Sequence, residues 1–329
     1  MCLGLQRGMD SAVSTAARAL SVGDPLLALK HVGLRSDPPA LALRGVALAQ
    51  LGEWAKALLL LRRAAKAFGD AEPLARARAT LAAAEVALAL RDLRGAGRGL
   101  DEAIRQLSRR GDIVNAAFAR LLQVRRLVLL GDVDAAEQAL QKVRLEQAPA
   151  RLAATAKLLE ADIASKRVHA RAAERALLEA ERAAQDSRIP ALLAEIETGR
   201  KRLAAPVARL LEQGDDRLVA LGELERLLGS DKLLVDACRR EVRQGARAVS
   251  LVTRPVLLEL LVALAEQAPR EVPRDALIAR VFGVRRANES HRVRLRVEVG
   301  RLRKLLRSLA ELRAIDAGFV LEPRTPQPL

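Results

Sequence analysis

The chain has 329 residues and a formal net charge of +16; half of its residues are hydrophobic, but only 2% are aromatic and none is tyrosine. Such a length allows two domains, and a core built mainly from leucine and alanine favours packed helices over sheets. Cys2 and Cys238 form neither a disulfide framework nor a metal-ligand spacing, and we expect Cys238 to be an ordinary strand residue rather than a redox thiol. No apolar stretch approaches a signal peptide or the ~20 residues of a membrane span. We therefore expect a soluble, cytoplasmic protein with no membrane partner.

A pattern recurs along the first 185 residues. Each copy has a turn, an alanine, a leucine four residues later and a small residue after three more. The alanines are Ala57, Ala96, Ala136 and Ala173, spaced 39, 40 and 37 residues apart. Small residues at these places let two helices approach closely, while leucine fills the gap to the next pair. The pattern predicts stacked helical hairpins.

The best copy, from Leu41 to Ala64, resembles the tetratricopeptide repeat. It has Gly45, Leu51-Gly52, Trp54 and Ala57 at that family's spacing. The resemblance implies an α-solenoid over residues 1–187 whose concave groove binds a protein or peptide partner. The period exceeds the usual ~34 residues, so a generic antiparallel helical array stays open as the alternative. Trp54 could line the groove, but we expect it in the core.

Residues 188–230 predict a helical cap that connects the repeats to the rest of the chain. Turn signals lie near Ser187-Arg-Ile-Pro190, Gly214-Asp-Asp216 and Gly229-Ser230. Between them the pattern allows one or two further helices, and Pro206 is interpreted as a helix start or kink.

Residues 289–306 predict a strongly basic amphipathic helix, followed by a small β-hairpin over 312–321. Nine arginine or lysine residues and two glutamates lie between positions 285 and 307. Such a surface attracts phosphates, because their neutralisation releases condensed counterions. Asn288 is expected to cap the helix. The plainer alternative is a solvated face in an arginine-rich protein. One apolar stripe is expected to face a core: Leu295, Val299, Leu302, Leu306 and Leu309.

Residues 231–323 resemble the C-terminal effector domain of OmpR/PhoB-type bacterial transcription regulators. The resemblance rests on the order of the elements more than on any one motif, and it implies a winged helix-turn-helix domain with short strands and a β-hairpin wing. The fold class expected for the whole chain is therefore mainly α. The matching segments are 232–236, 241–243 and 248–251 as strands, 254–264 and 273–283 as the first two helices, 295–304 as the recognition helix and 316–319 as the wing turn.

By the geometry of that family, the third helix lies in the major groove of double-stranded DNA and the wing reaches a minor groove. Carried over by position, Arg294, Val297 and Arg301 would face base edges, and Glu298 could accept a hydrogen bond from cytosine. Arg313 is the substitute for the wing's usual arginine. The flanking cations would hold phosphates, which set register without reading sequence: Arg292, Arg296, Arg303 and Lys304.

Two departures from the family bear on function. The first helix usually opens with Thr-x-x-Glu, where this chain has Val252 and Pro255, and the wing turn Ile315-Asp-Ala-Gly-Phe319 lacks an arginine. We expect a sequence-specific transcriptional regulator, with a homodimer as one arrangement open to it. The alternative is an interaction scaffold in which the winged helix docks protein rather than DNA.

Motifs that would indicate catalysis are missing from the sequence. There is no phosphate-binding glycine-rich loop, and His31, His169 and His291 have no second ligand at metal spacing. Relatives of this type usually carry a phosphorylatable receiver domain where this chain has repeats. We therefore expect no enzyme, no cofactor and no metal, and regulation through a bound protein. The proline-rich residues 324–329 are expected to be a disordered tail.

Overall fold

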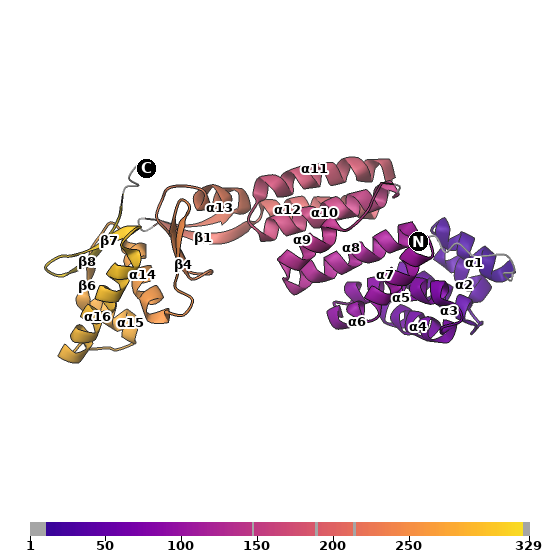
Figure 1. Cartoon of the computed structure of the whole chain (residues 1–329), viewed down its shortest axis with the longest axis horizontal. Helices are drawn as coiled ribbons and strands as arrows, with labels where there is room; N and C mark the ends of the chain where they lie inside the picture. Colours follow the sequence, from indigo (N-terminus) through magenta and orange to yellow (C-terminus); the bar gives the residue numbers. More distant parts are fainter. Residues whose placement is uncertain (1–10, 147, 188–189, 213–214, 325–329) are drawn as a thin grey trace. The chain divides into compact units, whose positions relative to one another are not determined.

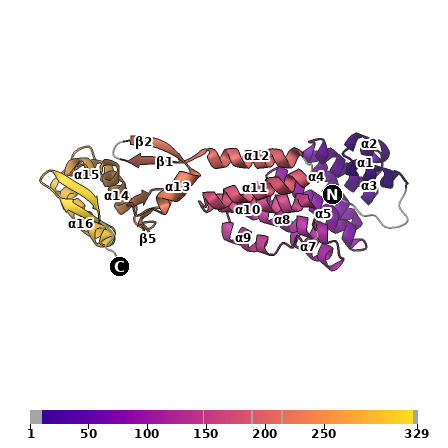
Figure 2. The same ribbon diagram turned by 90° about the horizontal axis from the view of Figure 1, so that it is seen from above.

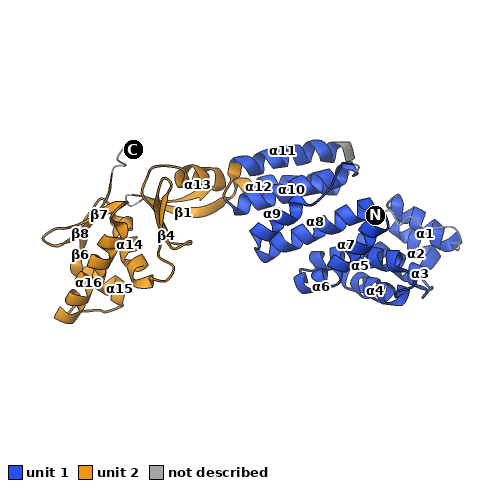
Figure 3. Ribbon diagram, viewed as in Figure 1, with its two compact units in different colours: residues 1–167, 171–202 blue, residues 168–170, 203–329 orange. Residues whose placement is uncertain are grey.

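The computed structural model describes residues 11–146, 148–187, 190–212 and 215–324. These residues are mainly helical, and their strands are small antiparallel pairs and triplets that begin at Pro206, which confirms the expected mainly α class. None of the described helices is long and apolar enough to cross a bilayer. The chain forms two compact units, residues 1–167 with 171–202 and residues 168–170 with 203–329 (Figure 3).

The first unit is a succession of helices in which neighbours along the chain pack together. A second set of contacts joins α1 to α3, α3 to α5, α5 to α8 and α8 to α10, so these helices form one row. The helices (Figure 1) are α1 (Ser11–Ser21), α2 (Pro25–Val32), α3 (Pro38–Gln50), α4 (Trp54–Phe68), α5 (Pro73–Ala89), α6 (Leu93–Gly97), α7 (Leu100–Arg109), α8 (Ile113–Leu130), α9 (Val133–Gln141), α10 (Ala150–Lys166), α11 (Ala170–Ser187) and α12 (Pro190–Ala204).

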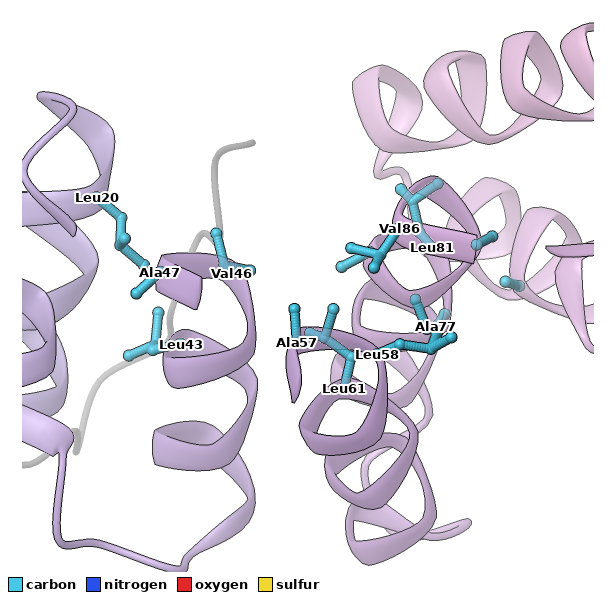
Figure 4. Packing of buried hydrophobic residues seen from close by; sticks show 14 of the residues in the cluster. Leu20, Leu43, Val46, Ala47, Ala57, Leu58, Leu61, Ala77, Leu81 and Val86 are labelled. Atoms are coloured by element: carbon cyan, nitrogen blue, oxygen red, sulfur yellow. The ribbon is translucent and has the colours of Figure 1, made fainter. Parts of the chain in front are cut away.

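The recurring alanines lie at the closest approaches of these helices. Ala57, Ala96, Ala136 and Ala173 are each 0% exposed. Close packing also explains the glycine at position 45 of α3, because a Cβ atom at Gly45 would lie 2.6 Å from the Cγ atom of Leu61. In Figure 4, the side chain of Leu20 lies beside that of Ala47, and Leu58 lies beside Ala77. Small residues thus set the spacing and leucines fill the core.

A left-handed residue ends four helices of the row. Gly52, Arg91, Gly131 and Val168 have φ values of 82°, 60°, 83° and 63°. They follow α3, α5, α8 and α10 at the same spacing as the alanines. Glycine adopts this backbone region without steric penalty, whereas arginine and especially β-branched valine do not. The repeat in the sequence is therefore accompanied by a repeat in backbone conformation at the ends of these helices.

The helical expectation for residues 188–230 is wrong over residues 206–212 and 215–220. α12 is a helix, but β1 (Pro206–Glu212) and β2 (Asp215–Ala220) form an antiparallel hairpin, and α13 (Leu221–Leu228) follows. Proline cannot donate a helical hydrogen bond, and Val207 and Val219 favour strands. The hairpin also belongs to the second compact unit, which begins before residue 231.

Beyond the β1–β2 hairpin and α13, the described part of the second unit contains two three-stranded antiparallel sheets and three helices. The core is shared by the helices and both sheets, with Leu260, Leu277, Leu302 and Phe319 buried in it. Except for the two-residue strand β6, which was not expected, the elements overlap with the expected strands and helices. They are β3 (Leu234–Asp236), β4 (Glu241–Gln244) and β5 (Arg247–Ser250), then α14 (Pro255–Gln267), β6 (Val272–Pro273), α15 (Arg274–Phe282), α16 (Glu289–Leu306), β7 (Ala310–Ala314) and β8 (Gly318–Pro323), with β8 between β6 and β7 (Figure 1).

Two single-residue expectations are wrong. Trp54 opens α4 at the surface, with 41% of its area exposed, instead of lying in the core. Cys238 lies in the turn between β3 and β4 and is exposed, rather than in a strand. The expected tail falls, from residue 325 onward, outside the described residues.

Candidate nucleic-acid interface and repeat surface

The helix α16 has one buried and one exposed face. Leu295, Val299 and Leu302 are buried, as expected, whereas Val293 and Val297 on the other face are each 48% exposed. The N-terminus is fixed by Asn288, whose side chain accepts the N–H of His291 at 2.9 Å. The Nδ1 atom of His291 accepts the N–H of Asn288 in return, at 3.3 Å. This reciprocal cap holds the first turn of the helix.

Cationic side chains surround the exposed valines. Arg294, Val297 and Arg301 follow one another at steps of three and four, so they share one side of α16. All three are exposed. The guanidinium group can donate two parallel hydrogen bonds to phosphate or to the edge of guanine. The other cations expected to contact DNA are exposed as well: Arg292, Arg296, Arg303, Lys304 and Arg313.

Arg294 is positioned by Phe282, an aromatic residue that was not predicted from the sequence to have a role in the site. The guanidinium carbon of Arg294 lies 4.5 Å from the ring centre of Phe282, the last residue of α15. The same ring stacks with His291 at 6.4 Å between ring centres. A cation over an aromatic face is attracted by the ring quadrupole. Phe282 thus joins the end of α15 to both the cap and the exposed face of α16.

Glu298 does not fit the expectation that it faces a base edge. Its side chain is buried, and its Oε1 atom accepts a hydrogen bond from Arg301 at 2.8 Å. The position falls next to Val299 at the border of the apolar stripe, where helical spacing turns it toward the body of the unit. Glu298 therefore orients Arg301 instead of presenting a carboxylate to a ligand.

The flanking arginines are held to different degrees. Arg296 pairs with Glu289 at 3.2 Å and Arg292 lies 3.7 Å from Asp275, and all four side chains are largely exposed. Such pairs contribute little and exchange readily for a phosphate. Arg303 is held more firmly, because its Nε atom donates to the carbonyl of Leu312 at 2.8 Å.

The turn of the β7–β8 hairpin is clamped by Arg274 of α15. Its guanidinium donates to the carbonyl oxygens of Ile315, at 2.9 Å, and Asp316. The guanidinium carbon also lies 5.3 Å from the ring centre of Phe319. On the outer strand, Arg313 pairs with Glu322 at 2.6 Å. The hairpin is therefore fixed beside α15, while the expected minor-groove arginine already has an acidic partner.

A second candidate surface lies on the row of helices in the first unit. Glu85, Arg125 and Asp162 each precede the left-handed turn residue of their own helix by six positions. The equivalent position in α3 is Val46, which is buried. Where the first copy has an apolar residue, the next three copies carry charges that alternate in sign. We call Glu85, Arg125 and Asp162 the charge ladder.

The electrostatics of the charge ladder show that its members interact in crowded surroundings. Burial raises the pKa of Glu85 and of Asp162, and the positive charge of Arg125 opposes both shifts. Burial lowers the pKa of Arg125, against the attraction of both carboxylates. Arg125 also pairs with Glu195 of α12. Glu85 nevertheless exposes surface to water, so the ladder combines partial desolvation with access to a ligand.

Within the residues that the structure describes, no three His, Cys, Asp or Glu side chains gather as a metal site would require. Comparison of the chain with protein-family models, with curated proteins and with solved structures found no match. The two resemblances therefore depend on the residues and elements named above.

Proposed function

We propose that this chain is a sequence-specific DNA-binding transcriptional regulator, and that its second unit is a winged helix-turn-helix domain of the OmpR/PhoB type. The observation that carries the proposal is the division of α16. One face is buried in the core, and the other presents Arg294, Val297 and Arg301 among further cations. A helix with an exposed cationic face that also contains an apolar residue fits the chemistry of the major groove.

In this proposal α16 lies in the major groove. Arg294 and Arg301 donate to guanine edges, and Val297 contacts a thymine methyl group. Phe282 and Glu298 hold those two arginines in place. The phosphate contacts come from Arg292, Arg296 and Lys304, and they set the register of the helix on the duplex. Arg303 also contacts phosphate in this proposal, but its main contact is the hydrogen bond that it donates to the carbonyl of Leu312 in the hairpin.

We also propose that the helical row is a tetratricopeptide-like solenoid that binds a protein or peptide partner. The support is the charge ladder, because charges in crowded surroundings do less for stability than the apolar residue that α3 has at the same position. A bound partner with complementary charges would form ion pairs with these side chains. Such a partner would take the regulatory place of a receiver domain.

The alternative, a scaffold whose winged helix docks protein, is favoured by one observation. Arg313, the residue expected to replace the wing arginine, is paired with Glu322. A wing without a free arginine has less to offer a minor groove. The two functions differ in whether the protein distinguishes one DNA sequence from another.

Selection from random double-stranded DNA with the full chain, at about 150 mM salt, separates the two functions. We expect one sequence class to be enriched. The variant Arg294→Ala/Arg301→Ala should lose about 1–3 kcal/mol per base contact and should relax specificity at those positions. Arg226→Ala, which removes an exposed charge from α13, is the control. Salt-sensitive binding without any enriched sequence would favour the scaffold.

A further inference from the structure

The β1–β2 hairpin has one covered and one open face. Val219 is buried on the face that α13 packs against. On the opposite face, Leu211 is 43% exposed and Leu218 is 66% exposed. Val207, which lies at a register shift at the start of β1, is 47% exposed. The two strands lie side by side in Figure 2 and form a sheet of their own. Large aliphatic side chains are therefore gathered on an uncovered face.

Such a face is unusual for a sheet of this size. An isolated two-stranded hairpin is marginally stable in water, and further packing normally completes it. Gathered exposed aliphatic residues mark interaction sites more often than single exposed ones do. Among the described residues, α13 completes only one side of the hairpin. We therefore expect a binding partner to cover the open face of the hairpin.

The charges on the open face indicate which occupant fits. Arg209 pairs opposite Leu218, and Leu211 pairs opposite Asp216, so all four share the face. The Nε atom of Arg209 donates to Asp216 at 2.6 Å. The face thus carries a positive and a negative group between aliphatic residues. A partner with charges of one sign, including nucleic acid, would meet a repelling group on it.

A second copy of the same face meets no such conflict. Rotation by 180° about an axis that lies in the plane of the face, along the diagonal from Leu211 to Leu218, places Arg209 of one copy opposite Asp216 of the other, and each leucine opposite its own counterpart. We propose that this hairpin face, made of Arg209, Leu211, Asp216 and Leu218, is the interface of a two-fold homodimer. The dimer does not depend on DNA binding. If the proposed function holds, the dimer would present two copies of α16 to two half-sites.

The first test measures the mass of the full chain in solution by light scattering after size-exclusion chromatography. We expect twice the chain mass of 35.6 kDa. Leu218→Asp should shift the protein to one chain mass, while its far-ultraviolet circular dichroism and thermal unfolding stay those of a folded protein. Leu178→Asp on α11, where the leucine is 46% exposed, is the matched control and should leave the dimer intact.

The second test uses exchanged charges. Arg209→Asp leaves two negative groups on the face and Asp216→Arg leaves two positive ones, so each variant alone should dimerise at least tenfold more weakly. Mixing the two variants should restore a dimer, because opposite charges then meet across the axis. A wild-type chain that stays monomeric up to about 100 µM would overturn the proposal. Unchanged dimers of both single variants, or a mixture that stays monomeric, would overturn it as well.

Discussion

At the scale of single residues, Arg91 has a backbone conformation that suits glycine. Its φ is 60°, and a side chain in this region costs roughly 1–2 kcal/mol. Glycine would remove that cost but would lose about 0.5–1 kcal/mol through greater freedom in the unfolded state. We therefore expect Arg91→Gly to raise the free energy of unfolding by up to about 1 kcal/mol, measured by urea denaturation.

The matched control is Gly52→Ala at the equivalent turn. No atom lies within 4 Å of a Cβ added at Gly52, where φ is 82°, so only the backbone opposes the substitution. This variant should lose about 1 kcal/mol. If Arg91→Gly destabilised the protein while Gly52→Ala left it unchanged, the shared turn geometry would not be the cause of either effect.

Phe282 supports a prediction on DNA binding. Phe282→Leu keeps an apolar side chain but removes the ring that lies 4.5 Å from the guanidinium of Arg294. A cation–π contact contributes about 0.5–2 kcal/mol, so affinity for the selected DNA site should fall about 2- to 30-fold. Fluorescence anisotropy with labelled duplex measures the loss. In the background Arg294→Ala the same substitution should have little further effect, and an undiminished effect there would exclude a role through Arg294.

Residue roles were harder to predict from the sequence than residue positions. The apolar stripe of α16 and the cap at Asn288 follow from helical spacing and a local preference. Phe282 and Arg274 are different, because their partners lie 12 and more than 40 positions away. Glu298 shows the same limit, since its burial depends on how α16 sits in its unit. Local pattern carries no information on such contacts.

At the scale of elements, the charge ladder gives the molecule a pH dependence. The pKa of Glu85 in the folded chain is raised by burial, so the unfolded state loses its proton more readily. Folding is therefore penalised above the folded pKa, and the penalty disappears as the pH falls below the unfolded value near 4.5. We expect Glu85→Gln to raise the melting temperature at pH 7 and to have little effect near pH 4.

Glu181→Gln tests the same chemistry with the opposite sign. The side-chain hydrogen bond from Arg200 lowers the pKa of Glu181. The ionised Glu181 carboxylate therefore stabilises the folded chain at pH 7, and this stabilisation is lost on acidification. This variant should lower the melting temperature at pH 7. Parallel thermal scans from pH 4 to pH 7 compare the two. A gain from Glu85→Gln that did not depend on pH would show that burial of the charge is not its origin.

The elements themselves could be predicted where periodicity was strong. Helices with recurring alanines and leucines, and the strands and helices from residue 232 onward, lie where the sequence indicates. The β1–β2 hairpin could not be predicted in this way. Leu210, Leu211 and Leu218 are as compatible with a helix as with a strand, and pairing between strands is a non-local contact. Pro206 and Gly214-Asp-Asp216 are local signals, but they fit a helix start or kink and a turn between helices as well as they fit a hairpin.

At the scale of the whole molecule, net positive charge is densest from residue 231 onward, in the segment that contains α14, α15 and α16. From residue 231 onward there are 20 basic and 12 acidic residues, within a chain of net charge +16. We expect DNA affinity to fall steeply with salt. Arg296→Ala should reduce the slope of log K against log salt by about 0.9, the value of one phosphate contact, without changing the preferred sequence.

Equilibrium titrations between about 50 and 200 mM salt measure that slope. Arg294→Ala is the informative contrast, because a base contact should change the preferred sequence more than the slope. If both variants changed slope and specificity alike, the division of α16 into base-facing and phosphate-facing arginines would be wrong.

The alternating charges of the helical row also restrict how the chain can change its length. The left-handed turns at Arg91 and Gly131 are both followed by an aspartate that caps the next helix, Asp92 and Asp132. Deleting residues 92–131 would join equivalent backbone geometries without a break. It would also remove Arg125 and leave Glu85 beside Asp162, two carboxylates whose pKa values burial already raises. The backbone geometry is therefore compatible with the loss of one repeat. The alternation of charges, however, is kept only when repeats are lost or gained two at a time.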